Sequence, residues 1–155
     1  MLKNKILLGV ASLFIVLVFA NANQKTRTEG DKIEWLTIEE AQALNKENPR
    51  TIFIDVYTNW CGWCKKMDKA TFQNAEIVDF VKGKYYAVKL NAESKTEIVF
   101  NGQKMTEQQL ARSMRVSGYP TIVMMDETLK NIQPVAGYKN PSQFKKMLTQ
   151  YDAKK

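Results

Sequence analysis

The chain has 155 residues, a formal net charge of +7, two cysteines and no histidine. Its lysines are scattered among carboxylates, and no arginine-rich stripe alternates with aromatic residues. The sequence therefore lacks the pattern that is typical of a nucleic-acid-binding protein. We interpret the charge as a solvated surface, with steering of an acidic partner as the alternative.

The first 22 residues have the three parts of a secretory signal peptide. Lys3 and Lys5 precede an apolar run, Ile6 to Ala20, which ends in small residues. The run is shorter than the roughly 20 residues that comfortably cross a bilayer. We therefore expect cleavage after Ala22, with a retained N-terminal anchor as the alternative, and no acyl anchor, because no cysteine follows the run. An exported protein is predicted, periplasmic in a bacterium with two membranes.

Residues 23–32 are polar and aperiodic, which predicts a flexible leader before a single domain over residues 33–155. A short strand is expected at "IEWL". A helix should begin at Thr37, because Glu40 completes a capping box, and end at Asn48 before a proline. Its apolar face is expected to comprise Ile38, Ala41 and Leu44.

The segment "TIFIDVY", residues 51–57, has a continuous apolar run that is typical of a central, fully buried strand. A helix through Lys65, Met67 and Lys69 should follow it, then a helix entered at Asn74. A further strand is predicted at 85–91.

The last third of the chain begins with a predicted hairpin around Asn101-Gly102, a pair typical of a type I′ turn. A helix from Thr106, a strand entered through Pro120, an antiparallel partner at 129–135 and a closing helix capped by Asn140 complete the order. This order predicts an α/β fold: a central mixed β-sheet flanked by helices on both faces, with an inserted hairpin and helix.

Both cysteines lie in "NWCGWCKK", residues 59–66, and could form a redox pair, half of a metal site or a structural bridge. A bridge between Cys61 and Cys64 closes too small a loop to restrict the unfolded chain much. A zinc site would need carboxylates or a second subunit, and haem attachment would need a histidine where Lys65 stands. We therefore expect no metal and no cofactor.

A helix N-terminus at Cys61 would favour its thiolate, and Cys64 would come round to the same face of the first turn. The spacing predicts that Cys61 is exposed and attacks a disulfide, while Cys64 is covered and resolves the mixed disulfide.

The segment "FIDVYTNWCGWCKKM" resembles the active-site segment of the thioredoxin superfamily. Three more segments resemble that family in the same order: "AVKLN" its third strand, "VSGYPT" its cis-proline loop and "VAGYKNPSQFKKML" its last strand and helix. The resemblance covers about residues 33–150. It implies a thioredoxin-like fold with the insertion, at 92–117, before the cis-proline loop.

The resemblance implies roles for individual residues. Asp55 matches a buried acid that handles the proton of Cys64; the alternative is a strand-end carboxylate bonded to backbone. Lys89 matches the lysine beside that acid; the alternative is an exposed strand lysine. Pro120 matches the cis-proline that faces the disulfide. The substrate-binding surface implied in this way comprises Trp60, Gly62, Trp63, Tyr119 and Pro120.

The sequence thus favours an exported thiol-disulfide oxidoreductase. A reductase is favoured over an oxidant, because Gly62 and Trp63 add no charge between the cysteines. Expected partners are disulfide-bearing exported proteins and, as the electron donor, a membrane-embedded thiol reductase, and a monomer is expected. The alternatives are a non-catalytic thioredoxin-like binding or chaperone module, and a disulfide oxidase or isomerase.

Overall fold

The computed structural model of the chain describes residues 32–154; the predicted signal peptide, residues 1–22, and the leader up to residue 31 lie outside this range. The first half of the described chain contains β1 (Trp35–Leu36), α1 (Ile38–Glu47), β2 (Thr51–Tyr57), α2 (Gly62–Met67), the π-helical turn η1 (Asp68–Phe72) and α3 (Ala75–Val81). The second half contains β3 (Tyr85–Asn91), β4 (Glu97–Phe100), β5 (Gln103–Thr106), α4 (Glu107–Ser113), β6 (Thr121–Met125), β7 (Ile132–Ala136) and α5 (Pro141–Asp152).

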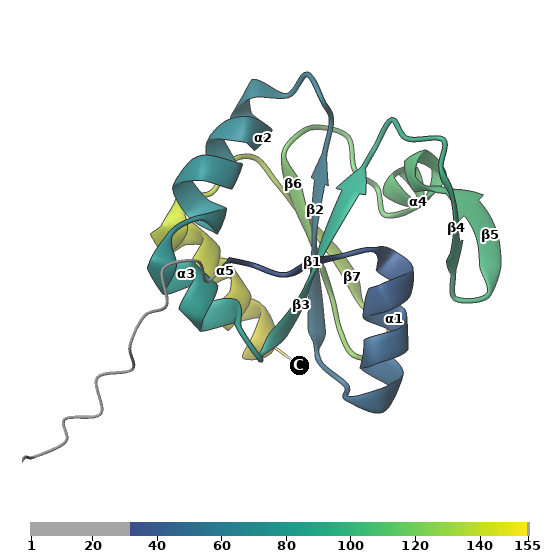
Figure 1. Cartoon of the computed structure of the whole chain (residues 1–155), viewed down its shortest axis with the longest axis horizontal. Helices are drawn as coiled ribbons and strands as arrows, with labels where there is room; N and C mark the ends of the chain where they lie inside the picture. The colour runs from purple at the N-terminus through teal and green to yellow at the C-terminus, as the bar shows by residue number, and fades with distance from the viewer. Residues whose placement is uncertain (1–31, 155) are drawn as a thin grey trace, which may run out of the picture.

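The main sheet has five strands in the order β1-β3-β2-β6-β7 (Figure 1). The first three run parallel, and β6 and β7 are antiparallel additions. The sheet is therefore mixed, as predicted, and β2 lies at its centre. Residues 51–56 of β2 are all buried, because helices cover both faces.

Successive side chains of β2 point to opposite faces of the sheet. Phe53 belongs to the core under α2, α3 and α5, whereas Ile52 and Ile54 belong to the core under α1 and α4. Figure 1 shows α2, α3 and α5 on one side of the strands, and α1, α4 and the β4–β5 hairpin on the other. The predicted fold class is confirmed.

Side-chain caps fix where the helices begin. Capping boxes at Thr37, Thr106 and Asn140 start α1, α4 and α5, and Asn74 caps α3. These are the starts that the sequence predicts. The helix after the cysteines differs, because it continues beyond Met67 as the π-helical turn η1.

The expected apolar face of α1 is wrong at one position. Leu44 is 40% exposed, and Asn45 is buried instead. The Asn45 amide donates to the carbonyl of Glu127 at 2.7 Å, and its oxygen accepts from the amide of Arg50 at 2.9 Å. These two bonds tie the end of α1 to two loops, and so turn the asparagine inward.

The inserted hairpin forms a separate two-stranded sheet that packs on α1. Asn101 and Gly102 have φ values of 50° and 79°, as a type I′ turn requires. Glu39 and Gln42 of α1 supply side-chain partners along β4: Glu39 accepts from the Val99 amide, and Gln42 donates to the Val99 carbonyl and accepts from the Asn101 amide, each at 2.9 Å. The helix thus pairs a strand edge that would otherwise be open.

Candidate active site

Cys61 and Cys64 form a disulfide at the carboxyl end of the central strand, with Cα atoms 5.3 Å apart. Cys61 is the N-cap of α2, and its sulfur accepts the backbone amide of Cys64 at 3.0 Å. After reduction, the same amide can stabilise a thiolate on Cys61. The predicted helix start and the predicted pairing of the two sulfurs are both present.

The predicted exposure of Cys61 is wrong for this oxidised state. Cys61 is only 4% exposed, and Cys64 is buried as expected. The bond to Cys64 and the amide contact hold the Cys61 sulfur against the first turn of α2. The exposed residues next to the two cysteines are instead Trp60, Gly62 and Trp63.

Asp55 lies in β2 on the face that α2 covers, and it is 1% exposed. Lys89 of β3 is its register partner, and the Lys89 ammonium lies 2.6 Å from Oδ2 of Asp55. Oδ1 is buried and has no hydrogen-bond partner within residues 32–154. Burial raises the pKa of Asp55 to about 6, although the Lys89 charge opposes this rise.

Lys89 is held between two carboxylates and three aromatic rings. Its ammonium also bonds to Asp68, and it lies 4.7, 5.1 and 5.4 Å from the ring centres of Trp35, Tyr57 and Phe72. Burial alone would lower the pKa of Lys89, but Asp55 and Asp68 outweigh it and raise the pKa. The lysine therefore stays charged.

The sequence analysis missed Asp68. It follows Cys64 by four residues, so it continues the helix face on which Cys64 lies, and this spacing is the signal that could have identified it. Its bond to Lys89 links α2 and its π-helical extension to β3, and through Lys89 to Asp55 on β2. The helix that carries the cysteines is thus tied to the buried acid.

The charged cluster reaches solvent on the β1–β3 side of the sheet. A hollow of about 620 Å³ opens there. It is lined by Lys32, Ile33, Trp35, Asp68, Phe72, Gln73 and Lys89. Asp55 does not line this hollow, whereas Lys89 and Asp68, to which it is linked, do.

Two exposed tryptophans flank the disulfide. Trp60 is 67% exposed and lies edge-on to Tyr119 at 6.0 Å, with its indole N–H bonded to Glu93 at 2.9 Å. Trp63 is 56% exposed and lies 5.4 Å from the ring of Tyr138. Neither indole is buried in the core, so both are available for contact with another molecule.

The loop that enters β6 brings the ring of Tyr119 to Trp60. The Tyr119–Pro120 peptide bond is cis, as the resemblance implied. Pro120 is buried, and its carbonyl accepts the amide of Gly137 at 2.8 Å, which joins the entry of β6 to the end of β7.

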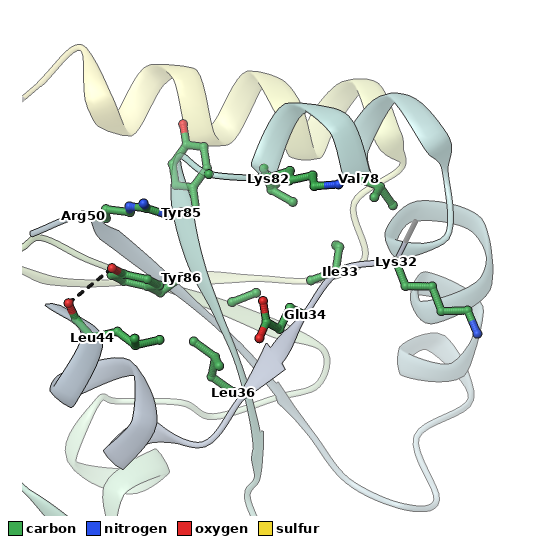
Figure 2. Close-up of a pocket in the computed structure, with 13 residues that line it drawn as sticks. Lys32, Ile33, Glu34, Leu36, Leu44, Arg50, Val78, Lys82, Tyr85 and Tyr86 are labelled. Carbon is green, nitrogen blue, oxygen red and sulfur yellow. Dashed lines mark hydrogen bonds between the residues drawn. The ribbon is translucent and has the colours of Figure 1, made fainter. Parts of the chain in front are cut away.

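A second cavity, of about 150 Å³, lies between α1, α3, β1 and the start of β3 (Figure 2). Tyr86 closes part of it, with its hydroxyl bonded to the carbonyls of Leu44 and Asn48 and its ring beneath Arg50. The start of β3 pairs with the start of β2, whereas the cysteines follow the end of β2. This cavity is therefore at the opposite end of the parallel strands from the disulfide.

The part of the chain that the structure describes holds no group of three or more histidine, cysteine, aspartate or glutamate residues arranged for a metal ion. Over the same residues, each helix is too short or too polar to cross a membrane.

Comparisons with known proteins agree with this architecture. Residues 38–152 match the model of the thioredoxin-like domain family. The thiol:disulfide interchange protein DsbD of Pectobacterium atrosepticum is 25% identical over 107 residues, 68% of this chain and 17% of that protein. The disulfide bond reductase DsbH of Chlamydia pneumoniae is 24% identical over 113 residues, 72% of this chain and 68% of that protein.

A solved structure, of a DsbH oxidoreductase, superposes with a TM-score of 0.63 and 19% identity, covering 84% of this chain and 91% of that one. That likeness shows the fold, and the chain spans only 17–18% of the length of the first DsbD relatives it matches. The chain belongs to the thioredoxin-like domain family, and its two cysteines, Cys61 and Cys64, are bonded to each other in the Cys-Gly-Trp-Cys segment.

Proposed function

We propose that this protein reduces disulfide bonds of exported proteins in the periplasm through its Cys-Gly-Trp-Cys dithiol. One observation carries the proposal: the paired cysteines begin a helix that Asp68 and Lys89 connect to a buried acid, Asp55, whose pKa is raised to about 6. A structural bridge would need no such acid. A dithiol that passes through two thiolate states needs a group that takes up and returns a proton near neutral pH.

The reaction proceeds by two exchanges. The Cys61 thiolate attacks one sulfur of the substrate disulfide, which forms a mixed disulfide and releases the other substrate sulfur as a thiolate that takes up a proton. The Cys64 thiol then loses its proton to Asp55, and its sulfur attacks Cys61, which releases the second substrate thiolate. Two electrons pass to the substrate, and the protein ends with the Cys61–Cys64 disulfide.

Asp55 is suited to this proton transfer by its unbonded Oδ1 and by its pKa of about 6. Lys89 keeps the second carboxylate oxygen in place and limits the rise of the pKa. The substrate-binding surface would comprise Trp60, Gly62 and Trp63, which are next to the cysteines in the sequence, and Tyr119 and Pro120, which precede β6.

The direction of electron flow follows from the residues between the cysteines. Gly62 and Trp63 add no positive charge that would stabilise the Cys61 thiolate strongly, which favours a reducing pair over an oxidising one. The Chlamydia pneumoniae relative is named a disulfide bond reductase, which also favours a reducing pair. Repeated turnover then needs an electron donor, and we propose a membrane-embedded thiol reductase that returns two electrons to a monomeric protein.

A redox titration tests the direction. The purified protein is equilibrated in dithiol and glutathione buffers, and the fluorescence of the tryptophans beside the disulfide reports its state. We expect a two-electron transition near about −270 mV, the value typical of thioredoxin. A transition near about −120 mV would make the protein a disulfide donor and would overturn the proposed direction.

Two cysteine variants separate an enzyme from a binding module. Cys61→Ser should abolish disulfide exchange, because the attacking sulfur is lost. Cys64→Ser keeps that sulfur and should accumulate a covalent adduct with a disulfide substrate, which mass spectrometry detects. A non-catalytic module would instead bind the same partner in the native protein and in both variants, with no exchange in any of them.

A further inference from the structure

Each of the two tryptophans beside the disulfide contacts a charged side chain, Trp60 an acidic one and Trp63 a basic one. The Trp60 indole donates to the Glu93 carboxylate. The Lys66 ammonium lies 4.6 Å from the ring centre of Trp63 and 5.5 Å from that of Tyr138. One side of the disulfide is therefore acidic and the other side is basic.

The sheet order places these charges on opposite sides of the disulfide. Glu93 follows β3, and Tyr138 follows β7. In the order β1-β3-β2-β6-β7, β2 separates these two strands, and the cysteines follow β2. A segment that crosses the disulfide from one flank to the other therefore passes from a negative side to a positive one.

The helix that carries the cysteines has exposed lysines without a carboxylate partner in the described part of the chain, and Lys66 is the one that aromatic rings hold on the basic side. Lys65, Lys66 and Lys69 are exposed, and their spacing of three and four residues places Lys69 beside both of the others. Within residues 32–154 none of the three has a carboxylate partner at ion-pair distance, and the nearby Asp68 is already bonded to Lys89. A lysine that only solvates a surface is free to move, whereas the rings of Trp63 and Tyr138 position Lys66 at the edge of the site.

We propose that this basic flank selects disulfide substrates in which acidic residues lie next to the reactive cysteine. The inference rests on the proposed reductase function and adds a substrate class to it. A substrate carboxylate pairs with Lys66, helped by Lys65 and Lys69, while an apolar neighbour packs on Trp63. The chemistry is unchanged: the substrate disulfide gains two electrons, and Cys61 and Cys64 lose them as their disulfide forms.

Three peptides of equal length test the proposal. Each has one cysteine in a disulfide with 2-nitro-5-thiobenzoate, with glutamates, glutamines or lysines on one side of that cysteine and glutamines on the other, so that the varied charges are not also placed against Glu93. The protein is first reduced with dithiothreitol, which is then removed. Attack by Cys61 on the peptide sulfur releases the coloured thiolate, whose absorbance gives the second-order rate constant.

We expect the glutamate peptide to react on the order of tenfold faster than the lysine peptide at low salt, as several exposed charge pairs allow. The glutamine peptide should be intermediate. Raising the ionic strength from about 0.05 to about 0.5 M should reduce the ratio, because exposed charges are screened.

Lys66→Glu should reverse or abolish the preference for the glutamate peptide. Lys66→Arg should retain this preference, since arginine keeps the charge and stacks on aromatic rings. The matched control is Lys104→Glu, which changes the net charge equally but lies on the exposed hairpin strand β5. The control should keep the native ratio of rates.

Each result decides a separate point. Equal rates for the three peptides, or a ratio that Lys66→Glu leaves unchanged, would overturn the basic flank as a selector and leave the reductase function standing. A ratio lost equally in Lys104→Glu would attribute the preference to net charge and would also overturn it. No reaction with any of the peptides would overturn the proposed function itself.

Discussion

The two faces of the sheet differ in their aromatic content, and the Lys89 ammonium that pairs with Asp55 contacts rings of one face. The face under α2, α3 and α5, the aromatic face, holds a cluster of rings among aliphatic side chains: Trp35, Phe53, Phe72 and Phe144 meet largely edge to face, with ring centres 5.0 to 5.8 Å apart for the closest pairs. The face under α1 and α4 is mainly aliphatic, built from isoleucine, valine, leucine and methionine.

The charged cluster around Lys89 therefore lies on one face of the sheet, and the inserted hairpin and helix pack on the other. On the aromatic face, rings with few rotamers support both the cysteine helix, through Phe72, and the Lys89 ammonium. On the aliphatic face, the core extends to include a hairpin and a helix between β3 and β6. The insertion therefore packs on α1 without displacing any residue around the disulfide.

Matched truncations on the two faces give the strongest test of this separation. Phe72→Ala and Phe100→Ala each remove a buried ring, so each should lower the free energy of unfolding by about 3–5 kcal/mol. Only Phe72 touches Lys89. We therefore expect Phe72→Ala alone to move the pKa of Asp55 away from about 6.

Urea unfolding measures the first quantity, and a carbon-13 NMR titration of the Asp55 carboxyl measures the second. If the two variants shifted the Asp55 titration equally, the faces would be coupled, and the proposed division would be wrong.

The buried acid gives the next largest effect. Burial raises the pKa of Asp55 from its ordinary value of 3.8 to about 6, so folding takes up a proton between these pH values. Stability is therefore lost as pH rises through this window. Asp55→Asn removes the buried charge and should raise the free energy of unfolding at pH 8 by about 3 kcal/mol, the energy of this pKa difference.

The gain should fade as pH falls below 6 and vanish only near about pH 3, below both pKa values, where Asp55 is protonated in the folded and the unfolded state. Urea unfolding of the oxidised protein across this range measures it. A gain that is independent of pH would mean that packing, and not the charge, causes the effect.

The fold could be predicted from the sequence because its signals are local. The continuous apolar run at 51–57, the turn pair Asn101-Gly102 and the cap residues Thr37 and Asn140 each determine one element, and the structure has all of them. Leu44 was misplaced because periodicity alone does not report that Asn45 bonds to the distant loop at Glu127 and to Arg50 in the loop after α1.

The site was only partly predictable for the same reason. Cys61, Cys64, Asp55 and Lys89 occupy spacings or strand positions that the family resemblance identifies. Residues brought in from other elements, such as Asp68 beside Lys89, Glu93 beside Trp60 and Tyr138 beside Trp63, depend on tertiary contacts over 21 to 75 positions. The spacing of Asp68 from Cys64 places it on the cysteine-bearing face of the helix, but no local pattern reports which residue of another element it contacts.

The smallest expected effect concerns how the insertion is attached. Gln42 bonds the Val99 carbonyl and the Asn101 amide. Gln42→Ala should cost about 1–2 kcal/mol, two hydrogen bonds at roughly 0.5–1.5 kcal/mol each with partial compensation by water. Amide hydrogen exchange should accelerate at Asn101 and remain slow in β2, and the rate of disulfide exchange should not change. A slower exchange reaction would mean that the hairpin reaches the redox pair through α1, because no other contact of Gln42 is altered, and the two faces would then act as one unit.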